Sequence, residues 1–128
     1  MRMAASVSKP AASRGGQRLV RAQVLGAFHL SVHGRAIERA DWQRLSAERL
    51  VKLLLVSEGH CMPRELAIET LWPDLDPIRG SNQLRKALHF ARRVGLTDVL
   101  ASDGDRVRLE PALLDLDLDR LRAASWPG

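Results

Sequence analysis

The sequence predicts an α+β domain with an N-terminal antiparallel sheet, three helices and a C-terminal β-hairpin. Residues 19 to 37 place apolar side chains at mostly alternating positions, as short strands do. Residues 46 to 95 instead repeat apolar side chains at the three-and-four spacing of helices. Asp103 and Gly104 then form a hairpin-turn pair between two short alternating segments. With 128 residues and 45% hydrophobic content, the chain fits one small domain with tails.

The net charge of +5 comes from the N-terminal end of the chain. The excess equals the five basic residues among residues 1 to 22, where there is no acidic residue, and the rest of the chain is balanced. Residues 1 to 18 also lack hydrophobic periodicity, so we predict a disordered basic tail there. The tail has no apolar signal-peptide block, and no apolar run approaches the length of a membrane span, which predicts a cytoplasmic protein.

Residues 19 to 37 are predicted to form two or three short antiparallel strands. Leu30 and Val32 belong to the alternating apolar set, and His33 with Gly34 offers a tight turn. His29 and His33 would share a strand face. Two histidines without a third ligand are typical of a plain surface, so we expect no metal there.

Residues 46 to 57 have the pattern of a largely buried helix. Leu50 and Leu54 follow Ser46 at helical spacing, and serine is a favourable N-cap residue. Gly59 would close the helix, because glycine readily adopts the left-handed conformation found at helix ends.

A second helix is predicted over residues 63 to 71. Pro63 suits its first position, where the backbone N–H has no partner within the helix. Trp72 and Pro73 would end it, with Trp72 anchored in the core. The predicted inner face consists of Leu66, Ala67, Thr70 and Leu71.

Residues 77 to 95 predict a third helix with two unlike faces. The stretch contains five Lys and Arg residues and no carboxylate. A face that only contacts water usually mixes both signs, so an all-basic face is typical of a surface that binds a polyanion. The core face would be Gly80, Leu84, Ala87, Leu88, Ala91 and Val94. The opposite face would be Arg79, Asn82, Arg85, Lys86, His89 and Arg93, with Arg92 at its border and with Ile78 and Phe90 near its edges.

Only the short segment DLDP separates the second helix from the third, which is the arrangement of a helix-turn-helix. In the hairpin that follows, Val107 and Leu109 would point inward while Arg106 and Arg108 point away. Three helices followed by such a hairpin predict a winged helix-turn-helix over residues 19 to 113.

The order of these segments resembles the DNA-binding domain of the Streptomyces antibiotic regulatory protein family, which is an OmpR-like winged helix. The resemblance covers about residues 22 to 122. It implies that the third helix enters the major groove of promoter DNA, and that the wing approaches the minor groove or the backbone. The chain departs from the family pattern at Ala91 and Val107. The matching residues are Arg64, Glu65, Leu66, Leu71, Trp72, Pro73 and Asp74, and then Asn82, Leu84, Arg85, Leu88, Arg92 and Arg93.

Residues 114 to 128 are predicted to be a C-terminal segment. Family members usually continue here into a helical activation domain, so the chain is either a fragment cut at this point or a stand-alone regulator. The resemblance also adds RNA polymerase as a candidate partner, and it implies head-to-tail pairs on direct repeats of DNA. We expect the free chain to be a monomer.

The sequence thus predicts sequence-specific binding of double-stranded promoter DNA by a transcriptional regulator. Asn82, Arg85 and Lys86 are the predicted base readers, because these side-chain types match the edges of adenine and guanine. The wing and the N-terminal arginines would contact phosphate or the minor groove. The full predicted site is Arg79, Asn82, Arg85, Lys86, His89, Arg92, Arg93, Arg106 and Arg108.

Other functions are less well supported by the residues. No nucleophile motif or phosphate-binding glycine loop occurs, and Cys61 is the only cysteine, so we expect neither an enzyme nor a cofactor. Asp115, Asp117 and Asp119 lack the glycine and the terminal glutamate of a calcium loop; Asp119 is predicted to be a helix N-cap, with the other two on a solvated edge. The remaining alternative is a winged helix that binds protein and not DNA, which would expose aromatic or aliphatic side chains on the third helix.

Overall fold

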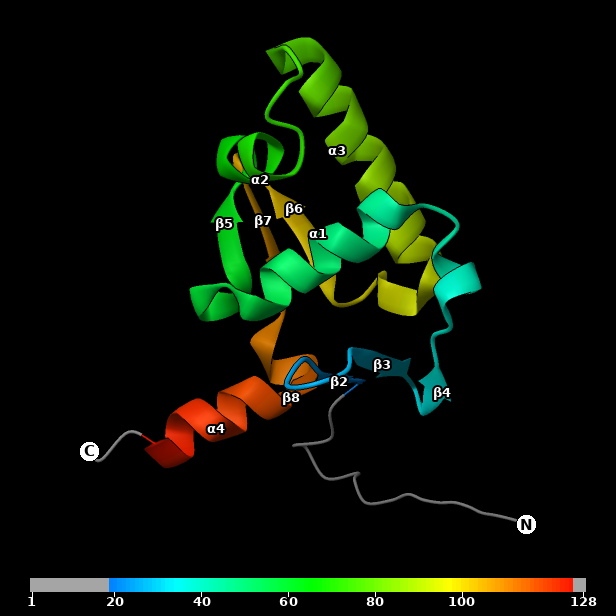
Figure 1. Cartoon of the computed structure of the whole chain (residues 1–128), viewed down its shortest axis with the longest axis vertical. Coiled ribbons are helices and arrows are strands. Elements are labelled where there is room, and N and C mark those ends of the chain that lie inside the picture. Colours follow the sequence, from blue (N-terminus) through cyan, green and yellow to red (C-terminus); the bar gives the residue numbers. More distant parts are fainter. Residues whose placement is uncertain (1–18, 126–128) are drawn as a thin grey trace.

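The computed structural model describes residues 19–125, so the predicted basic tail lies outside the described residues. This part of the chain contains the helices α1 (Leu45–Val56), α2 (Arg64–Leu71), α3 (Pro77–Ala91) and α4 (Asp117–Ser125), together with two sheets. The α+β class is confirmed. The N-terminal sheet and α4 lie at one end of the molecule, and α3 begins at the opposite end (Figure 1). Within residues 19–125, no helix is both long enough and apolar enough to span a membrane.

The predicted N-terminal strands are present as β2 (Val20–Gln23), β3 (His29–Val32) and β4 (Arg35–Ala36), paired in antiparallel order. His33 and Gly34 form the turn between β3 and β4, with φ angles of 53° and 80°. Positive φ at both central residues is what a two-residue hairpin turn of this twist requires. Alternate residues then face the core, and the buried set is Val20, Ala22, Leu30 and Val32.

The N-terminal sheet is mixed, whereas the sequence predicted an antiparallel one. β8 (Leu114–Leu116) pairs in parallel with β2, placing Leu114 opposite Val20. Leu114 and Leu116 are buried, as the two-residue period of a strand allows. A segment of three residues is too short for that period to be recognised in the sequence. Residues 114–116 are therefore part of this sheet.

α1 is the buried helix that the sequence predicted, but its predicted N-cap is wrong. The helix begins at Leu45 with Arg44 in the N-cap position and no side-chain cap. Ser46 lies inside the first turn, because the preceding turn with Gln43 at φ 62° brings the chain into helical geometry two residues earlier than a Ser46 cap would. α1 packs on α3 and buries the set Ala47, Leu50, Val51, Leu54 and Leu55.

The connection from α1 to α2 includes a strand that the sequence did not reveal. Gly59 has the predicted left-handed conformation, with φ 69°, but it does not close α1: the helix ends at Val56 with Ser57 as an extended C-cap, and Gly59 lies in the short turn Glu58–His60 that follows. The chain then forms β5 (Cys61–Pro63), so Pro63 ends a strand and precedes the first residue of α2. β5 pairs with the C-terminal hairpin.

The predicted inner face of α2 is only partly right. Ala67 is buried and Leu71 packs on the core, whereas Leu66 is 47% exposed and Thr70 is exposed. Ile68 takes the inward position because it contacts α3, where a Cβ added to Gly80 would lie 2.4 Å from its Cγ2 atom. Trp72 is half-buried against the core, as expected of an anchor.

α3 has the predicted core face in full: Gly80, Leu84, Ala87, Leu88, Ala91 and Val94 are all buried. Asp76 caps the helix by accepting a hydrogen bond from the backbone N–H of Arg79 at 2.9 Å. After Ala91 the chain makes one wide turn, residues Arg92–Leu96, in which Gly95 has φ 119°. This turn sends Leu96 into the core and ends the helical segment near its predicted limit.

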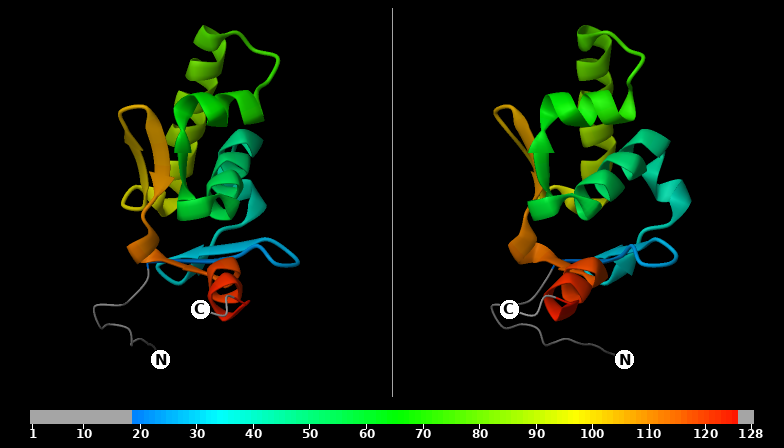
Figure 2. Two further views of the ribbon diagram at one scale, coloured as in Figure 1. Left: turned by 90° about the vertical axis from the view of Figure 1, so that its left-hand side faces the viewer. Right: turned by 60° about the vertical axis from the view of Figure 1, so that its left-hand side comes forward.

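The predicted hairpin is present as β6 (Leu100–Asp103) and β7 (Arg106–Leu109), joined at Gly104 with φ 59°. Val107 and Leu109 are buried, as predicted. With β5 on the other side of β7, the hairpin becomes a three-stranded antiparallel sheet. It stands alongside the helices (Figure 2).

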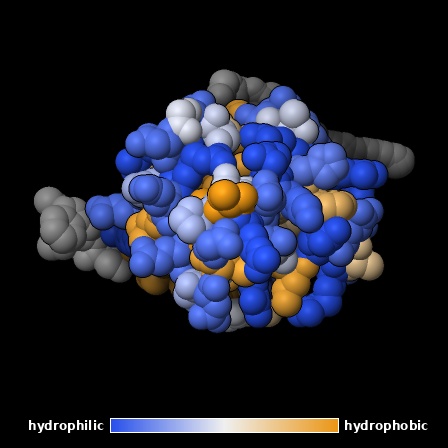
Figure 3. All heavy atoms as spheres, turned by 90° about the horizontal axis from the view of Figure 1, so that it is seen from above, coloured by the Kyte–Doolittle hydropathy of each residue, from blue (hydrophilic) through white to orange (hydrophobic). Residues whose placement is uncertain are grey.

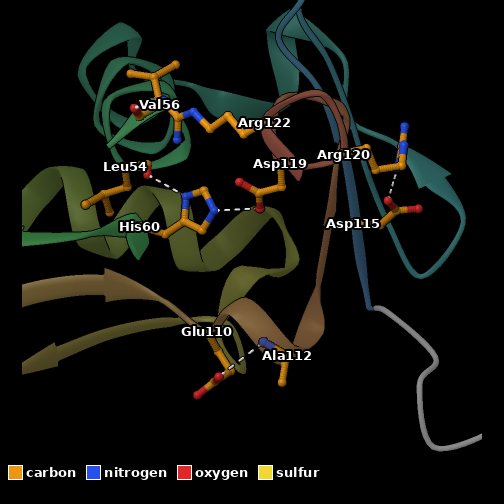
Figure 4. Close-up of polar contacts among 9 residues, drawn as sticks. All are labelled: Leu54, Val56, His60, Glu110, Ala112, Asp115, Asp119, Arg120 and Arg122. Carbon is orange, nitrogen blue, oxygen red and sulfur yellow. Dashed lines mark hydrogen bonds and ion pairs between the residues drawn. The ribbon is translucent and has the colours of Figure 1, made fainter. Parts of the chain in front are cut away.

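α4 is attached to the rest of the molecule by its first carboxylates, so the predicted role of Asp119 as an N-cap is wrong. The helix already begins at Asp117, whose two carboxylate oxygens accept hydrogen bonds from the backbone N–H groups of Val24 and Leu25 at 3.0 and 3.1 Å. Asp119 lies in the first turn of the helix and contacts buried His60, with 2.8 Å between Oδ2 and Nε2 (Figure 4).

The acidic edge around β8 is also more tightly bound than predicted. Asp115 pairs with Arg120 of α4, as Figure 4 shows, and with Arg21 of β2 at 3.4 Å. Arg122 approaches the backbone carbonyl of Val56 at 3.4 Å. These contacts hold β8, α4 and the end of α1 together, instead of leaving the carboxylates in open solvent.

Candidate nucleic-acid interface

The outward face of α3 carries most of the predicted site. Residues 79 to 89 of the predicted site lie on one side of α3, opposite the buried stripe, and Arg92 and Arg93 follow in the wide turn that continues the helix. Asn82, Arg85, Lys86, His89 and Arg93 are all exposed there, and Arg92 is half-buried at the border. Arg79 is exposed in the first turn, where its side chain also lies 3.7 Å from the capping carboxylate of Asp76.

The positive charge of this face is largely uncompensated. Within residues 19–125, Lys86, Arg92 and Arg93 form no ion pair. Arg79 is paired with an exposed carboxylate, a type of contact that contributes little energy. The face therefore attracts anions, and attraction by a cluster of like charges extends over about a Debye length of roughly 10 Å at 0.1 M salt.

Two polar side chains near the middle of the face are linked to each other. Arg85 donates a hydrogen bond from Nη1 to Oδ1 of Asn82 at 3.0 Å. This contact orients both groups. It leaves the NH₂ group of the Asn82 amide and the Nη2 and Nε groups of Arg85 available as donors. Donors fixed side by side in this way can contact adjacent acceptors on a base edge.

The C-terminal half of α3 is held by an aromatic contact. The rings of His89 and Phe90 meet edge to face at 5.1 Å, and the guanidinium of Arg44 lies 5.0 Å from the Phe90 ring centre. Phe90 is half-buried by these neighbours. His89 is exposed, and its edge-to-face contact with Phe90 restricts the orientation of its ring.

The two hairpin arginines differ in a way that the sequence did not predict. Arg106 is exposed, and its Nε donates to Sγ of Cys61 at 3.1 Å, which raises the pKa of the guanidinium further. Arg108 is half-buried, at 2.8 Å from Asp103 and 3.1 Å from Glu110, and hydrogen bonds to these carboxylates raise its pKa. Both arginines are cationic at all physiological pH values, but only Arg106 is free of a carboxylate partner within residues 19–125.

Glu110 is fixed in its charged form by the same contacts. The backbone N–H of Ala112 donates to it at 3.2 Å, and together with the Arg108 guanidinium this lowers the pKa of the carboxyl group (Figure 4). Asp103 and Glu110 thus offset the charge of Arg108. Arg108 therefore contributes less to the basic surface than the sequence analysis predicted.

Arg64 matters to this surface although the sequence analysis did not assign it there, and Ile78 is more prominent on it than predicted. Arg64 ties the start of α2 to the hairpin: its backbone N–H donates to the carbonyl of Asp105 at 2.7 Å, and its Nη1 donates to Ser102 at 2.8 Å. Ile78 is 76% exposed in the first turn of α3. The sequence analysis placed it near the edge of this face, and its position four residues before Asn82 puts it on the same side of the helix.

Seen from the end at which α3 begins, the surface is mainly hydrophilic, and separate hydrophobic patches interrupt it (Figure 3). No group of three or more potential metal-binding side chains occurs within residues 19–125. Comparison of the chain with protein-family models, with curated proteins and with solved structures found no match in any of the three.

Proposed function

We propose that the chain is a winged helix-turn-helix that binds double-stranded DNA as a transcriptional regulator. α2 and α3 are the helix-turn-helix, α3 enters the major groove, and the β6–β7 hairpin is the wing. The single observation that carries the proposal is the exposed basic face of α3, on which Lys86, Arg92 and Arg93 have no acidic partner within residues 19–125.

The dimensions of α3 support this role. A helix with its side chains is about 10–12 Å across, and the major groove is about 12 Å wide, so the exposed arc of α3 can enter the groove. Only one stripe of α3 is used for the core, so the opposite stripe can face DNA without cost to the fold. The tight contact between Gly80 and Ile68 fixes α3 on α2 as a rigid unit.

The resemblance to the Streptomyces antibiotic regulatory protein family points to the same role. It proposes promoter DNA as the ligand, RNA polymerase as a second partner, and head-to-tail pairs on direct repeats. In this proposal Asn82, Arg85 and Lys86 read bases, while Arg92, Arg93 and Arg106 contact phosphates. A regulator of this kind works in the cytoplasm, where bacterial promoters are.

A salt titration tests the proposal. Affinity for random duplex DNA, measured by fluorescence anisotropy, should fall steeply with salt, since each phosphate contact contributes about −0.9 to the slope of log K against log salt. Arg92→Ala with Arg93→Ala should flatten the slope by about 2, because each is proposed to contact one phosphate. Arg35→Ala is the matched control, because Arg35 lies on β4 in the sheet at the other end of the molecule.

A protein-binding winged helix is the second candidate, and one observation favours it. Leu66 and Ile78 are 47% and 76% exposed on the two helices of the proposed helix-turn-helix. Failure of the chain to bind duplex DNA at low salt would reject DNA binding and favour this alternative.

A further inference from the structure

Ile78 is the most exposed large hydrophobic residue within residues 19–125, at 76%. The start of α3 does not need it: Asp76 caps the helix and Pro77 takes the first position. Single exposed apolar residues are common on protein surfaces, so exposure alone indicates no function. Its position relative to the polar residues of α3 is what distinguishes it.

Ile78 stands in one row with the predicted base readers. Asn82 follows it by four residues and Arg85 by three more, so the three side chains recur about once per helical turn on the same line. All three are exposed, and the row lies opposite the buried stripe of α3. Ile78 also lies in the first turn, and residues near the start of a recognition helix are the ones that reach base edges.

Only one base offers an apolar group in the major groove. Thymine presents its C5 methyl there, whereas the edges of the other three bases present hydrogen-bonding groups that an isoleucine would desolvate without replacement. A β-branched side chain is also rigid, so little conformational entropy is lost on contact.

We infer that Ile78 is a specificity-determining residue that reads the C5 methyl of a thymine in the major groove. The inference rests on the proposed function, since it requires α3 to lie in that groove. Four residues of helix rise by about 6 Å, close to two base-pair steps of about 3.4 Å each. The thymine therefore lies within about two base pairs of the pair that Asn82 contacts.

The test uses deoxyuridine, which lacks only the methyl group and keeps its base pairing. Preferred sites are first selected from a random duplex library with the full chain, and each thymine of the best site is then replaced singly by deoxyuridine. Kd is measured by fluorescence anisotropy at one salt concentration. For the wild type, one replacement should weaken binding about four-fold, the factor expected for losing one buried methyl-sized group.

Three variants isolate the contribution of Ile78. Ile78→Ala should bind the thymine site about as weakly as the wild type binds the deoxyuridine site, and it should not distinguish the two DNAs. Ile78→Val keeps the branched methyl groups and should still distinguish them. Leu66→Ala removes an exposed aliphatic side chain from α2 and should behave as the wild type. Thermal unfolding checks that each variant is folded.

The outcomes separate this inference from the proposed function. Loss of the thymine preference in Ile78→Ala alone supports it. The inference is overturned, and DNA binding stands, if the wild type binds DNA but no single deoxyuridine replacement weakens its binding. The same holds if a replacement weakens binding by Ile78→Ala as much as it weakens binding by the wild type. Unchanged DNA affinity in Ile78→Ala also overturns the inference, and would favour contact of this side chain with a protein partner instead. Absence of any DNA binding rejects the proposed function, and the inference with it.

Discussion

Arg106 and Arg108 lie two residues apart on one strand, yet their surroundings predict different parts for them in the proposed DNA binding. The exposed side chain of Arg106 hydrogen-bonds to Cys61, whereas that of Arg108 lies between Asp103 and Glu110. The two carboxylates occupy the Nε and Nη1 donors of Arg108 and offset its charge, so the attraction of a phosphate to Arg108 is reduced. Its charge is therefore mainly structural.

Arg106→Ala should weaken binding to all duplex sequences by a similar factor and flatten the salt slope by about 1. Arg108→Ala should change the slope less and instead loosen the turn that Asp103 and Glu110 support. Salt-dependent anisotropy measurements on specific and random duplexes check both. A changed sequence preference in Arg106→Ala would make the hairpin a base reader and contradict this assignment.

The sequence predicted the burial of single residues correctly where a long repeat of apolar positions defined one face of a helix. The core face of α3 and the turn after it repeats over about four turns, and every residue predicted for it is buried. Leu66 and Thr70 were misplaced because α2 has only eight residues, too few to define a face without knowing its neighbour. The pairing of Arg108 could not be predicted, since Asp103 comes within 2.8 Å of it only through hairpin register.

At the scale of elements, the closeness of α2 and α3 depends on one glycine. A Cβ at Gly80 would lie 2.4 Å from the Cγ2 atom of Ile68, and this branched methyl group cannot rotate away freely. Gly80→Ala gains about 1 kcal/mol of helix propensity, but overpacking of this kind costs about 1–3 kcal/mol.

We therefore expect Gly80→Ala to lower the free energy of unfolding by about 1 kcal/mol, or to shift α3 outward. Urea unfolding measures the first effect. The cost should disappear in the Ile68→Ala background, because the clashing methyl group is then gone. Stabilisation by Gly80→Ala in the native background would show that α3 does not depend on this close approach.

The attachment of α4 depends on a carboxylate with an altered pKa. Partial burial alone would raise the pKa of Asp117, but hydrogen bonds from the N–H groups of Val24, Leu25 and Leu118 outweigh it and lower the pKa. A lowered folded-state pKa stabilises the fold above the unfolded value of about 3.9, and this stabilisation is lost as pH falls through the folded pKa.

Asp117→Ala should therefore lower the free energy of unfolding at neutral pH by about 1 kcal/mol. The difference from the wild type should shrink as the pH drops below about 4. Asp115→Ala is the matched control on β8, and it should cost less because its ion pairs with Arg21 and Arg120 involve largely exposed arginines. A difference that stayed constant from pH 7 to pH 3 would show that the charge of Asp117 does not matter.

Elements were predicted from the sequence where their signals were long or carried turn residues. His33 with Gly34 marked one turn, and Asp103 with Gly104 the other. β5 and β8 were missed because each has three residues and is defined by pairing with a distant strand. Their partners lie more than forty residues away in sequence, beyond any local pattern.

At the scale of the whole molecule, carboxylates near the C-terminal end are paired, whereas several cations on the outward face of α3 are not. Asp115, Asp119 and Glu110 near the C-terminal end are engaged by Arg120, His60 and Arg108. On the basic face, Arg79 pairs with the exposed carboxylate of Asp76, whereas Lys86, Arg92 and Arg93 form no ion pair within the described residues. The field of residues 19–125 should therefore orient the outward face of α3 toward a polyanion as it approaches.

We expect the free chain to be a monomer. Its net charge of +5 opposes self-association, and the large apolar residues are mostly inside the core. Light scattering at micromolar concentration should give the mass of one chain, and a second chain should join only on DNA with two adjacent sites. A stable dimer without DNA would contradict this expectation.

The most direct test of the central claim compares specific with random DNA for substitutions on α3. Arg85→Ala should cost about 1–3 kcal/mol on the selected site, relax the preference at one base position, and cost clearly less on a random duplex. Asn82→Ala and Lys86→Ala should behave in the same way, and all three should stay folded because none of these side chains is buried. Equal losses on specific and random DNA for all three would show that α3 only contacts the backbone and is not the element that reads sequence.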